Sequence, residues 1–148
     1  MADNTMHLEF PSKAQNVSFA RAAVAAFVSQ LDPTMPELAD ISTAVSEGVT
    51  NAVVHAYPDG VEGPVAITVQ LIGQLVSIDI KDQGCGISDL EAVRRFGTTT
   101  CGRERMGIGL SLIEACMDDM ELKSKEGEGT HLVMTKRFGQ QRGVLAND

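Results

Sequence analysis

Apolar and polar positions recur with two different periods along this chain, and the change of period marks the predicted elements. Apolar residues spaced three and four apart, the pattern of an amphipathic helix, run through residues 16–31 and 36–57. An Asp-Pro pair at 32–33 stops the first segment, and a proline suits the first turn of the second. We therefore predict two consecutive helices, the second ended by turn-forming residues at 58–60.

Five further segments alternate between apolar and polar side chains, as half-buried strands do. They are residues 6–10, 65–72, 75–81, 120–125 and 131–138. Gly73-Gln74 is a two-residue hairpin signal between the second and third segments, and a glycine-rich turn at 127–129 joins the last two. A third helix is predicted at 108–117.

Strands that come in hairpins and helices that come in separate blocks are typical of an α+β fold. We expect a two-layer α/β sandwich, in which helices cover one face of a mostly antiparallel mixed sheet. No internal repeat or linker divides the sequence. The prediction is one domain over residues 1–138, followed by a disordered tail at 139–148.

The charge and the longest apolar runs exclude some functions. With 12 Lys and Arg against 20 Asp and Glu the net charge is −8, whereas neutralising nucleic-acid phosphates needs clustered cations. We expect no direct nucleic-acid binding, although a nucleotide needs only a local positive site. No apolar run fits a secretory signal or a membrane span, so we expect a soluble cytoplasmic protein. Three cysteines without C-x-x-C spacing are interpreted as reduced, incidental thiols.

Three polar residues follow one line along the second predicted helix. Glu47, Asn51 and His55 are spaced four apart, and each step rotates the side chain by only about 40°. The line is either an ordinary solvated face or one wall of a cleft, because Gly48 and Val54 beside it are uncharged. Carboxylate and amide oxygens are ligands that suit Mg²⁺.

Two glycine loops could form the opposite wall of such a cleft. Asp82, Gly84 and Gly86 form a D-x-G-x-G pattern directly after a strand, where glycine allows the backbone to approach a ligand. Gly107 and Gly109 lie at the start of the third helix, where free N–H groups attract phosphate. Each pattern is also common in a plain turn.

The segment between the loops, residues 94–105, contains four of the 12 basic residues. On an acidic protein this local reversal of charge favours an anionic ligand. Its glycines and weak periodicity indicate either a mobile lid or a solvated loop.

The order of these motifs resembles the Bergerat-type (GHKL) ATP-binding fold of histidine kinases, mismatch-repair and chaperone ATPases, and small bacterial serine kinases. The order is E-x-x-x-N-x-x-x-H, D-x-G-x-G, a basic loop, G-x-G, and then Gly129-Thr130 in a late hairpin. The likeness extends over residues 6–137 to the anti-sigma F factor family of endospore-forming bacteria. The segments that carry this closer likeness are MHLEF at 6–10, SFAR at 18–21, QLDPTM at 30–35 and MDD at 117–119.

The resemblance implies a role for each motif residue. Glu47 would act as general base, and Asn51 would coordinate a Mg²⁺ ion held by the phosphates of ATP. Asp82 would bind the adenine amine, with Thr130 nearby. The remaining implied contacts are Gly84 and Gly86 at the base, Gly107 and Gly109 at the phosphates, Arg105 at the phosphates or a partner, and Arg21 at protein partners.

The resemblance also implies an activity. The chain would be an ATP-dependent serine kinase that acts as a homodimer, binds a sporulation sigma factor (sigma F), and phosphorylates a serine of the anti-anti-sigma antagonist. One alternative is an ATP-binding module that sequesters a transcription factor without efficient kinase activity. Another is the ATPase domain of a histidine kinase, which needs a separate phospho-accepting helix. The histidines of the chain are His7, His55 and His131, and none lies on such a helix.

Overall fold

The computed structural model describes residues 2–57, 61–85, 104–125 and 127–139, with the backbone alone at 104–106. Its strands are β1 (Asn4–Pro11), β2 (Pro64–Ile72), β3 (Leu75–Asp82), β4 (Asp119–Lys125) and β5 (Gly129–Arg137). They form one sheet in the order β1-β2-β3-β5-β4, and each neighbouring pair is antiparallel. The period-two segments therefore predicted the strands to within two residues at their ends.

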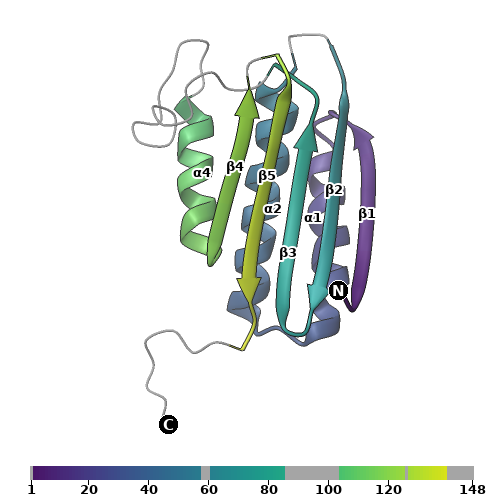
Figure 1. Ribbon diagram of the computed structural model, residues 1–148, viewed down its shortest axis with the longest axis vertical. Coiled ribbons are helices and arrows are strands. Elements are labelled where there is room, and N and C mark those ends of the chain that lie inside the picture. The colour runs from purple at the N-terminus through teal and green to yellow at the C-terminus, as the bar shows by residue number, and fades with distance from the viewer. Residues whose placement is uncertain (1, 58–60, 86–103, 126, 140–148) are drawn as a thin grey trace.

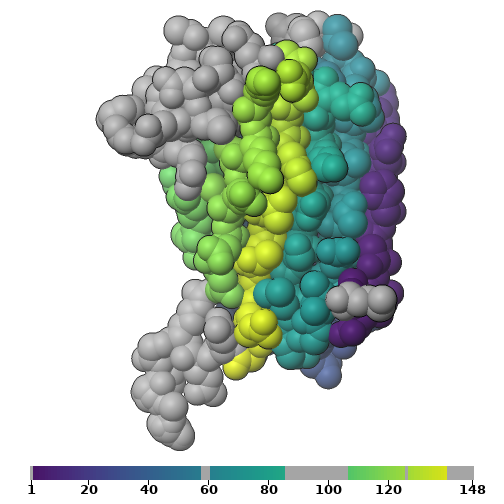
Figure 2. All heavy atoms as spheres, in the orientation of Figure 1, coloured from purple at the N-terminus to yellow at the C-terminus, as the bar shows by residue number. Residues whose placement is uncertain are grey.

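The helices pack against one face of this sheet and leave the other face open (Figure 1). They are α1 (Asn16–Val28), the short 3-10 helix η1 (Ser29–Leu31), α2 (Met35–His55) and α4 (Glu104–Cys116). Contacts join α1 to α2 and α2 to α4, so α2 is the central helix of the layer. This arrangement confirms the predicted two-layer α+β fold. Figure 2 shows the strand side of the molecule, where no helix covers β2, β3 and β5.

The predicted helix ends need two corrections. The first helix does not run unbroken to residue 31, because α1 tightens into η1 before Asp32 takes a left-handed conformation at φ 53°. The last helix begins at Glu104 rather than 108, so Gly107 lies inside α4 and not before it. Weak apolar periodicity concealed this start, since a helix needs a regular apolar stripe only where it packs.

The core lies between α2 and the inward-facing side chains of the sheet. Val65, Ile67, Val69, Val76, Ile78, Ile80, Leu132 and Met134 are buried strand residues, and Ile41, Val45, Val49 and Ala52 are buried on α2. Gly48 lets the helix approach closely, because a Cβ there would lie 2.6 Å from Ile80 Cδ1. Of the two uncharged residues beside the polar line, Gly48 is thus buried, whereas Val54 is 58% exposed.

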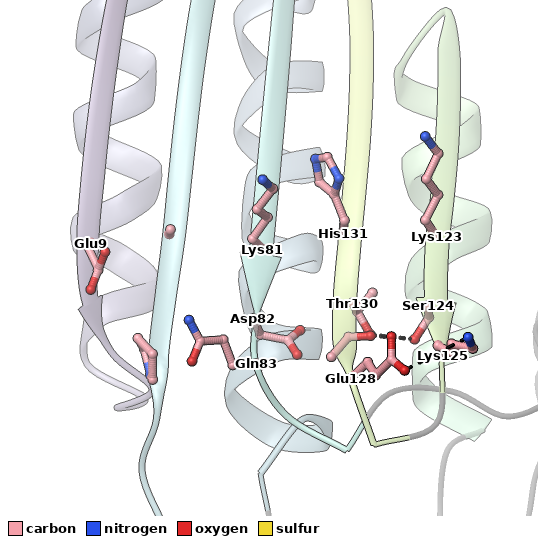
Figure 3. Close-up of a pocket in the computed structure, with 13 residues that line it drawn as sticks. Glu9, Lys81, Asp82, Gln83, Lys123, Ser124, Lys125, Glu128, Thr130 and His131 are labelled. Atoms are coloured by element: carbon pink, nitrogen blue, oxygen red, sulfur yellow. Dashed lines mark hydrogen bonds and ion pairs between the residues drawn. The ribbon is translucent and has the colours of Figure 1, made fainter.

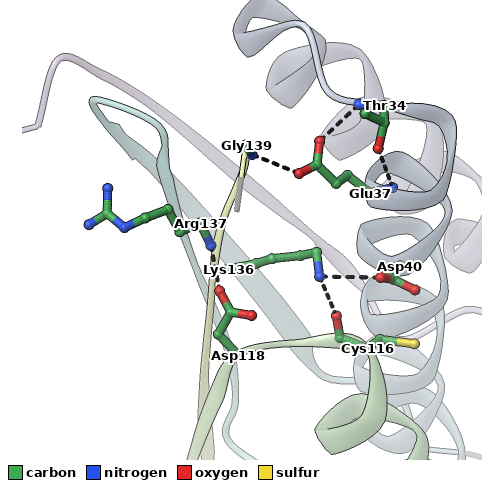
Figure 4. Close-up of polar contacts among 8 residues, drawn as sticks. All are labelled: Thr34, Glu37, Asp40, Cys116, Asp118, Lys136, Arg137 and Gly139. Carbon is green, nitrogen blue, oxygen red and sulfur yellow. Dashed lines mark hydrogen bonds and ion pairs between the residues drawn. The ribbon is translucent and has the colours of Figure 1, made fainter. Parts of the chain in front are cut away.

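A polar cluster fixes the helices at one end of the sheet (Figure 4). Thr34 and Glu37 form a capping box at the start of α2, and Glu37 also accepts a hydrogen bond from Gly139 N at 2.7 Å. Burial alone would raise the pKa of Glu37, but these hydrogen bonds outweigh it and lower that pKa. The buried Lys136 ammonium contacts Asp40 at 3.2 Å and donates to the Cys116 carbonyl at 3.0 Å. The cluster therefore ties β5 to both α2 and α4.

Among the described residues, no helix is long and apolar enough to span a membrane. The predicted tail lies outside the described residues from 140 onward.

Candidate functional site

Two residues of the polar line, Glu47 and Asn51, face α4. A Cβ placed on Gly109 of α4 would lie 2.8 Å from Glu47 Oε1 and 3.5 Å from Asn51 Oδ1. Glu47 and Asn51 are both only partly exposed. The absence of a side chain at 109 therefore allows α4 to approach both polar groups. The solvated-face interpretation of the line is wrong for these two residues.

The polar end of the site is a single row across three strands. Asp82 of β3 pairs with Thr130 of β5, and Thr130 pairs in turn with Ser124 of β4. The preceding inward-facing row is apolar and consists of Ile80, Leu132 and Leu122. Since inward positions repeat every two residues, each strand changes from apolar to polar at the inward position nearest this end of the sheet.

A cavity lies between this row and the polar line of α2. Asn51 and His55 contribute to its wall from α2, and Asp82 and Thr130 contribute from the sheet. Its apolar walls are formed by Ala52, Ala56, Ile80, Leu110, Leu122 and Leu132. Apolar walls with a few convergent polar groups at one end are typical of a site for a flat heterocycle.

A second, more open hollow lies on the uncovered face of the sheet (Figure 3). Lys81, His131 and Lys123 form one cross-strand row there, and His131 pairs with Asp79 at 2.9 Å. This hollow has charged walls and does not include Asn51.

Asp82 and Thr130 line both hollows. Of these two hollows, we assign the candidate site to the cavity against α2, because Asn51 and His55 line it as well and its other walls are apolar.

The loop after β3 is attached to the end of α2. Cys85 N donates to the Ala56 carbonyl at 2.7 Å, and a Cβ on Gly84 would overlap that carbonyl. The Tyr57 hydroxyl accepts from Gln83 N at 2.9 Å and donates to the Pro64 carbonyl at 2.6 Å. Gly84 is therefore required by the close approach of the two backbones, which holds Asp82 at a set place relative to Asn51.

Burial raises the pKa of the Asp82 carboxyl, because the cavity wall removes water from the charged form. Hydrogen bonds from the backbone N–H groups of Gly84, at 2.9 Å, and Thr130 act in the opposite direction. A half-buried carboxylate with N–H donors on one side is available to accept a further hydrogen bond from a ligand.

The residues present fit a purine nucleotide with magnesium. The apolar side chains suit a flat ring and the Asp82 carboxylate suits an amino group, while the cavity itself measures about 30 Å³. Glu47 and Asn51 face Gly109 in the first half of α4. Among the described residues, no group of three or more His, Cys, Asp and Glu side chains could hold a metal alone. Mg²⁺ commonly takes one or two protein oxygens and completes its coordination with phosphates and water, which is what a lone Asn51 oxygen would permit.

The other predicted site residues have different positions. His55 is half-buried in the last turn of α2 and lines the cavity. Gly107 is buried in the first turn of α4, and the backbone of Arg105 belongs to the same turn. Arg21 is exposed on α1, away from this cavity. Gly86, and the basic segment before α4, lie outside the described residues.

Sequence reasoning missed Ser124 and Tyr57. Ser124 continues the inward alternation of Met120 and Leu122, and a polar residue in that register was the available signal. Tyr57 is the one tyrosine of the chain and directly follows the helix with the polar line. Neither residue belongs to a spacing motif, so their role depends on contacts that only the fold creates.

Comparisons with known proteins identify the family and the fold. The histidine kinase-like ATPase domain family matches residues 10–136. The chain is 46% identical over 142 residues to the anti-sigma F factor of Bacillus subtilis, covering 95% of this chain and 97% of the relative. It is 45% identical over 139 residues to the anti-sigma F factor of Clostridium novyi, and this alignment covers 93% of this chain and 97% of the relative.

Two solved structures share the fold. The RsbU and RsbW domains of a Mycobacterium tuberculosis protein align with a TM-score of 0.68 at 23% identity, covering 91% of this chain and 32% of that one. The mycobacterial sensor histidine kinase MprB aligns with a TM-score of 0.54 at 16% identity, and this alignment covers 90% of this chain and 98% of that one. From the family match and the long alignments at 45–46% identity, it follows that the chain belongs to the anti-sigma F factors, within the histidine kinase-like ATPase domain family.

Proposed function

We propose that the protein is an anti-sigma factor and serine kinase. It binds a sporulation sigma factor, sigma F, and uses Mg-ATP to phosphorylate a serine of its anti-anti-sigma antagonist. The observation that carries the proposal is the convergence of Glu47 and Asn51 on Gly109, beside a cavity that ends in Asp82. The relatives' name, anti-sigma F factor, supports the choice of partner.

The proposed chemistry assigns one task to each side of the site. Magnesium supplies charge neutralisation of the phosphates when it is bound. Asn51 offers its amide oxygen to the metal, and Asp82 accepts a hydrogen bond from the adenine amine. Glu47 takes the proton of the antagonist's serine while that oxygen forms a bond to the γ-phosphorus and the bond to the ADP oxygen breaks. Positioning and electrostatics account for most of the rate in such transfers.

The partner contacts are proposed on other parts of the chain. Arg21 lies exposed on α1, where it is available to a protein partner. Arg105 precedes Gly107 in α4 and is assigned to the phosphates or to a partner. We propose a homodimer, as the family resemblance implies.

The test separates catalysis from nucleotide binding. A general base contributes about 10²–10⁴ in rate, so Glu47→Gln is expected to lower single-turnover phosphorylation of the antagonist by about that factor while ATP still binds. Labelled ATP and the purified antagonist are incubated with each variant, and acid-stable phosphoserine is quantified. Wild-type rates in Glu47→Gln would remove Glu47 from the mechanism.

Asn51→Ala serves as the companion variant, since it is expected to lose Mg-ATP affinity in calorimetry. Wild-type affinity in Asn51→Ala would contradict the metal role. If wild-type protein retains sigma binding but transfers no phosphate, a sequestering module replaces the kinase. If the phosphate is acid-labile, the chemistry is that of a histidine kinase.

A further inference from the structure

The uncovered face of the sheet presents two adjacent rows of outward side chains, and each row takes one residue from each strand. Outward positions repeat every two residues, and the strand register sets those of neighbouring strands level with one another. In the strand order β1-β2-β3-β5-β4, the first row is Glu9, Ala66, Lys81, His131 and Lys123. The second row is His7, Thr68, Asp79, Val133 and Glu121. Figure 3 shows Lys81, His131 and Lys123 side by side in the first row.

Three strands carry opposite charges in the two rows. Strand β3 has Lys81 in the first row and Asp79 in the second, and β4 has Lys123 and Glu121. On β1 the order is reversed, with a carboxylate in the first row and a histidine, positive when protonated, in the second. Strands β2 and β5 have an uncharged residue in at least one row, so no strand has like charges in both. Solubility alone does not require this order, because a net charge in any arrangement provides it.

Most of these charges have no ionic partner within their own chain. In the part of the chain that the structure describes, Lys81, Lys123 and Glu121 form no ion pair, whereas Asp79 pairs with His131 at 2.9 Å. Lys123 and Glu121 are also exposed. Both signs of charge are therefore available to a second molecule that lies on this face.

The charge order fits a second copy of the same sheet. A two-fold axis parallel to the rows and midway between them exchanges the two rows and leaves each strand opposite its own copy. Lys81 then faces Asp79 of the second copy, and Lys123 faces Glu121 of the second copy. Each contact occurs twice, because a two-fold interface uses the same surface on both molecules.

The other two-fold arrangement of stacked sheets is unfavourable. An axis parallel to the strands reverses the strand order and keeps each row opposite itself. Because β3 is the central strand, that axis places Lys81 against Lys81 of the second copy and Asp79 against Asp79 of the second copy. Like charges in direct opposition repel, so the charges select the axis that is parallel to the rows.

The middle of the face suits two sheets in contact. Its side chains are small or β-branched and only partly exposed: Ala66, Thr68, Ser77, Val133 and Thr135. Stacked sheets lie about 10 Å apart, a gap that a lysine and a carboxylate can span together. Five strands of seven to nine residues cover roughly 600 Å² at ordinary strand spacing. Two copies would bury roughly 1,200 Å², which is the lower end of the range for stable interfaces.

We propose that two copies of this chain associate through the uncovered face of the sheet. Lys81 and Lys123 of each copy pair with Asp79 and Glu121 of the other. This inference rests on the homodimer of the proposed function and names its interface. The candidate site lies against α2 on the opposite face of the sheet, so both sites stay open to nucleotide and to partners in such a dimer.

The experiment reverses one charge at a time on β4. Lys123→Glu and Glu121→Lys each place like charges in opposition at two symmetry-related contacts. Sedimentation equilibrium of the full chain is expected to show a wild-type dimer, and each variant should raise its dissociation constant by roughly tenfold to a hundredfold. Glu121→Lys changes the net charge of the chain from −8 to −6, so general repulsion between copies would predict tighter association instead.

Two combinations should restore association. The double variant Lys123→Glu/Glu121→Lys again faces opposite charges, and its dissociation constant should return to within about threefold of the wild type. A mixture of the two single variants should form a heterodimer, which native mass spectrometry identifies by mass. Ala26→Glu, which adds a charge on the exposed side of α1, should leave the wild-type constant unchanged. If a single variant fails to fold, Lys123→Gln and Glu121→Gln replace the pair, with an expected rise of roughly threefold.

The outcomes separate the interface from the homodimer itself. Wild-type dissociation constants in folded single variants would exclude the sheet face and leave the homodimer to another surface. A double variant as weak as the single variants, or a mixture without heterodimer, would also overturn the proposed pairing. A wild type that stays monomeric would remove both the interface and the homodimer, whereas ATP binding and phosphorylation test the kinase independently.

Discussion

At the scale of single residues, the site is built from polar groups placed where apolar ones would stabilise the fold more. Asp82 occupies the inward position that follows Ile78 and Ile80 on β3, and burial raises the pKa of its carboxyl. Charged groups lose favourable hydration when they are buried, so this carboxylate costs stability in the absence of a ligand. Proteins commonly accept such a cost at binding sites.

We predict that Asp82→Asn stabilises the protein without nucleotide but weakens ATP binding by roughly tenfold to a hundredfold. The folded state holds a proton on Asp82 more tightly than the unfolded state does, in which the pKa of this carboxyl is near 3.8. The stabilising contribution of the protonated Asp82 carboxyl is therefore complete below the pKa of the unfolded state. It is lost as the pH rises through the pKa of the folded state. The gain in unfolding free energy of Asp82→Asn over the wild type should therefore grow from pH 4 to pH 7.

Urea unfolding across that pH range, with calorimetry for ATP, checks both effects. Asp119→Asn on the exposed end of β4 controls for the change in net charge. If Asp82→Asn is less stable than the wild type at pH 7, the carboxylate stabilises the fold rather than destabilising it.

At the scale of elements, the site depends on how closely three backbones approach. Gly48 brings α2 close to β3, Gly109 brings α4 close to α2, and Gly84 brings the loop after β3 close to the end of α2. From the sequence, Gly84 was predicted in a loop, Gly48 on the second helix and Gly109 at the start of the third. In the folded chain two of these three glycines lie within helices, where the missing side chain matters more than backbone freedom.

The loop contact leads to a prediction for Tyr57, whose hydroxyl joins Gln83 N to the Pro64 carbonyl. Tyr57→Phe should weaken ATP binding by roughly threefold to tenfold, because the loop that positions Asp82 loses a hydrogen bond to the end of α2. Unfolding free energy should fall by only about 1 kcal/mol.

Ser12→Ala is the matched control, since Ser12 Oγ accepts from Gly63 N at 3.1 Å in the same region but does not contact the loop. Calorimetry should show unchanged ATP affinity for Ser12→Ala. Equal affinity losses in the two variants would indicate a general loosening rather than positioning by Tyr57.

At the scale of the whole molecule, one end of the sheet holds the cavity and the other end holds the helices together. Lys136 lies on the same face of β5 as Thr130, three inward positions further along, and its side chain is 4% exposed. Its contacts with Asp40 and the Cys116 carbonyl fix the ends of α2 and α4 that lie far from the candidate site. The register of both helices at Glu47 and Gly109 depends on this anchor.

The unequal burial of the ion pair predicts unequal costs of mutation. Asp40 is 39% exposed, so Asp40→Ala leaves a buried ammonium with one carbonyl partner, whereas Lys136→Met leaves a carboxylate that water can reach. We expect Asp40→Ala to lower the unfolding free energy by about 2–3 kcal/mol and Lys136→Met by about 1 kcal/mol.

Urea denaturation at neutral pH measures both variants and the double variant, which should be more stable than Asp40→Ala alone. The reverse order of the single variants would mean that the carboxylate, and not the ammonium, is the group that needs its partner.

The amino-acid sequence alone determined the elements and the fold class, and it named the motif residues of the candidate site. Side-chain period and turn residues act over a few neighbours, and those are enough to define a strand or to align Glu47 with Asn51. Tertiary structure decided what crosses between elements: that Gly109 faces Glu47 and Asn51, that Tyr57 hydrogen-bonds the loop after Asp82, and that Ser124 contacts Thr130. These contacts arise from strand register and helix packing between residues distant in sequence, which no local pattern encodes.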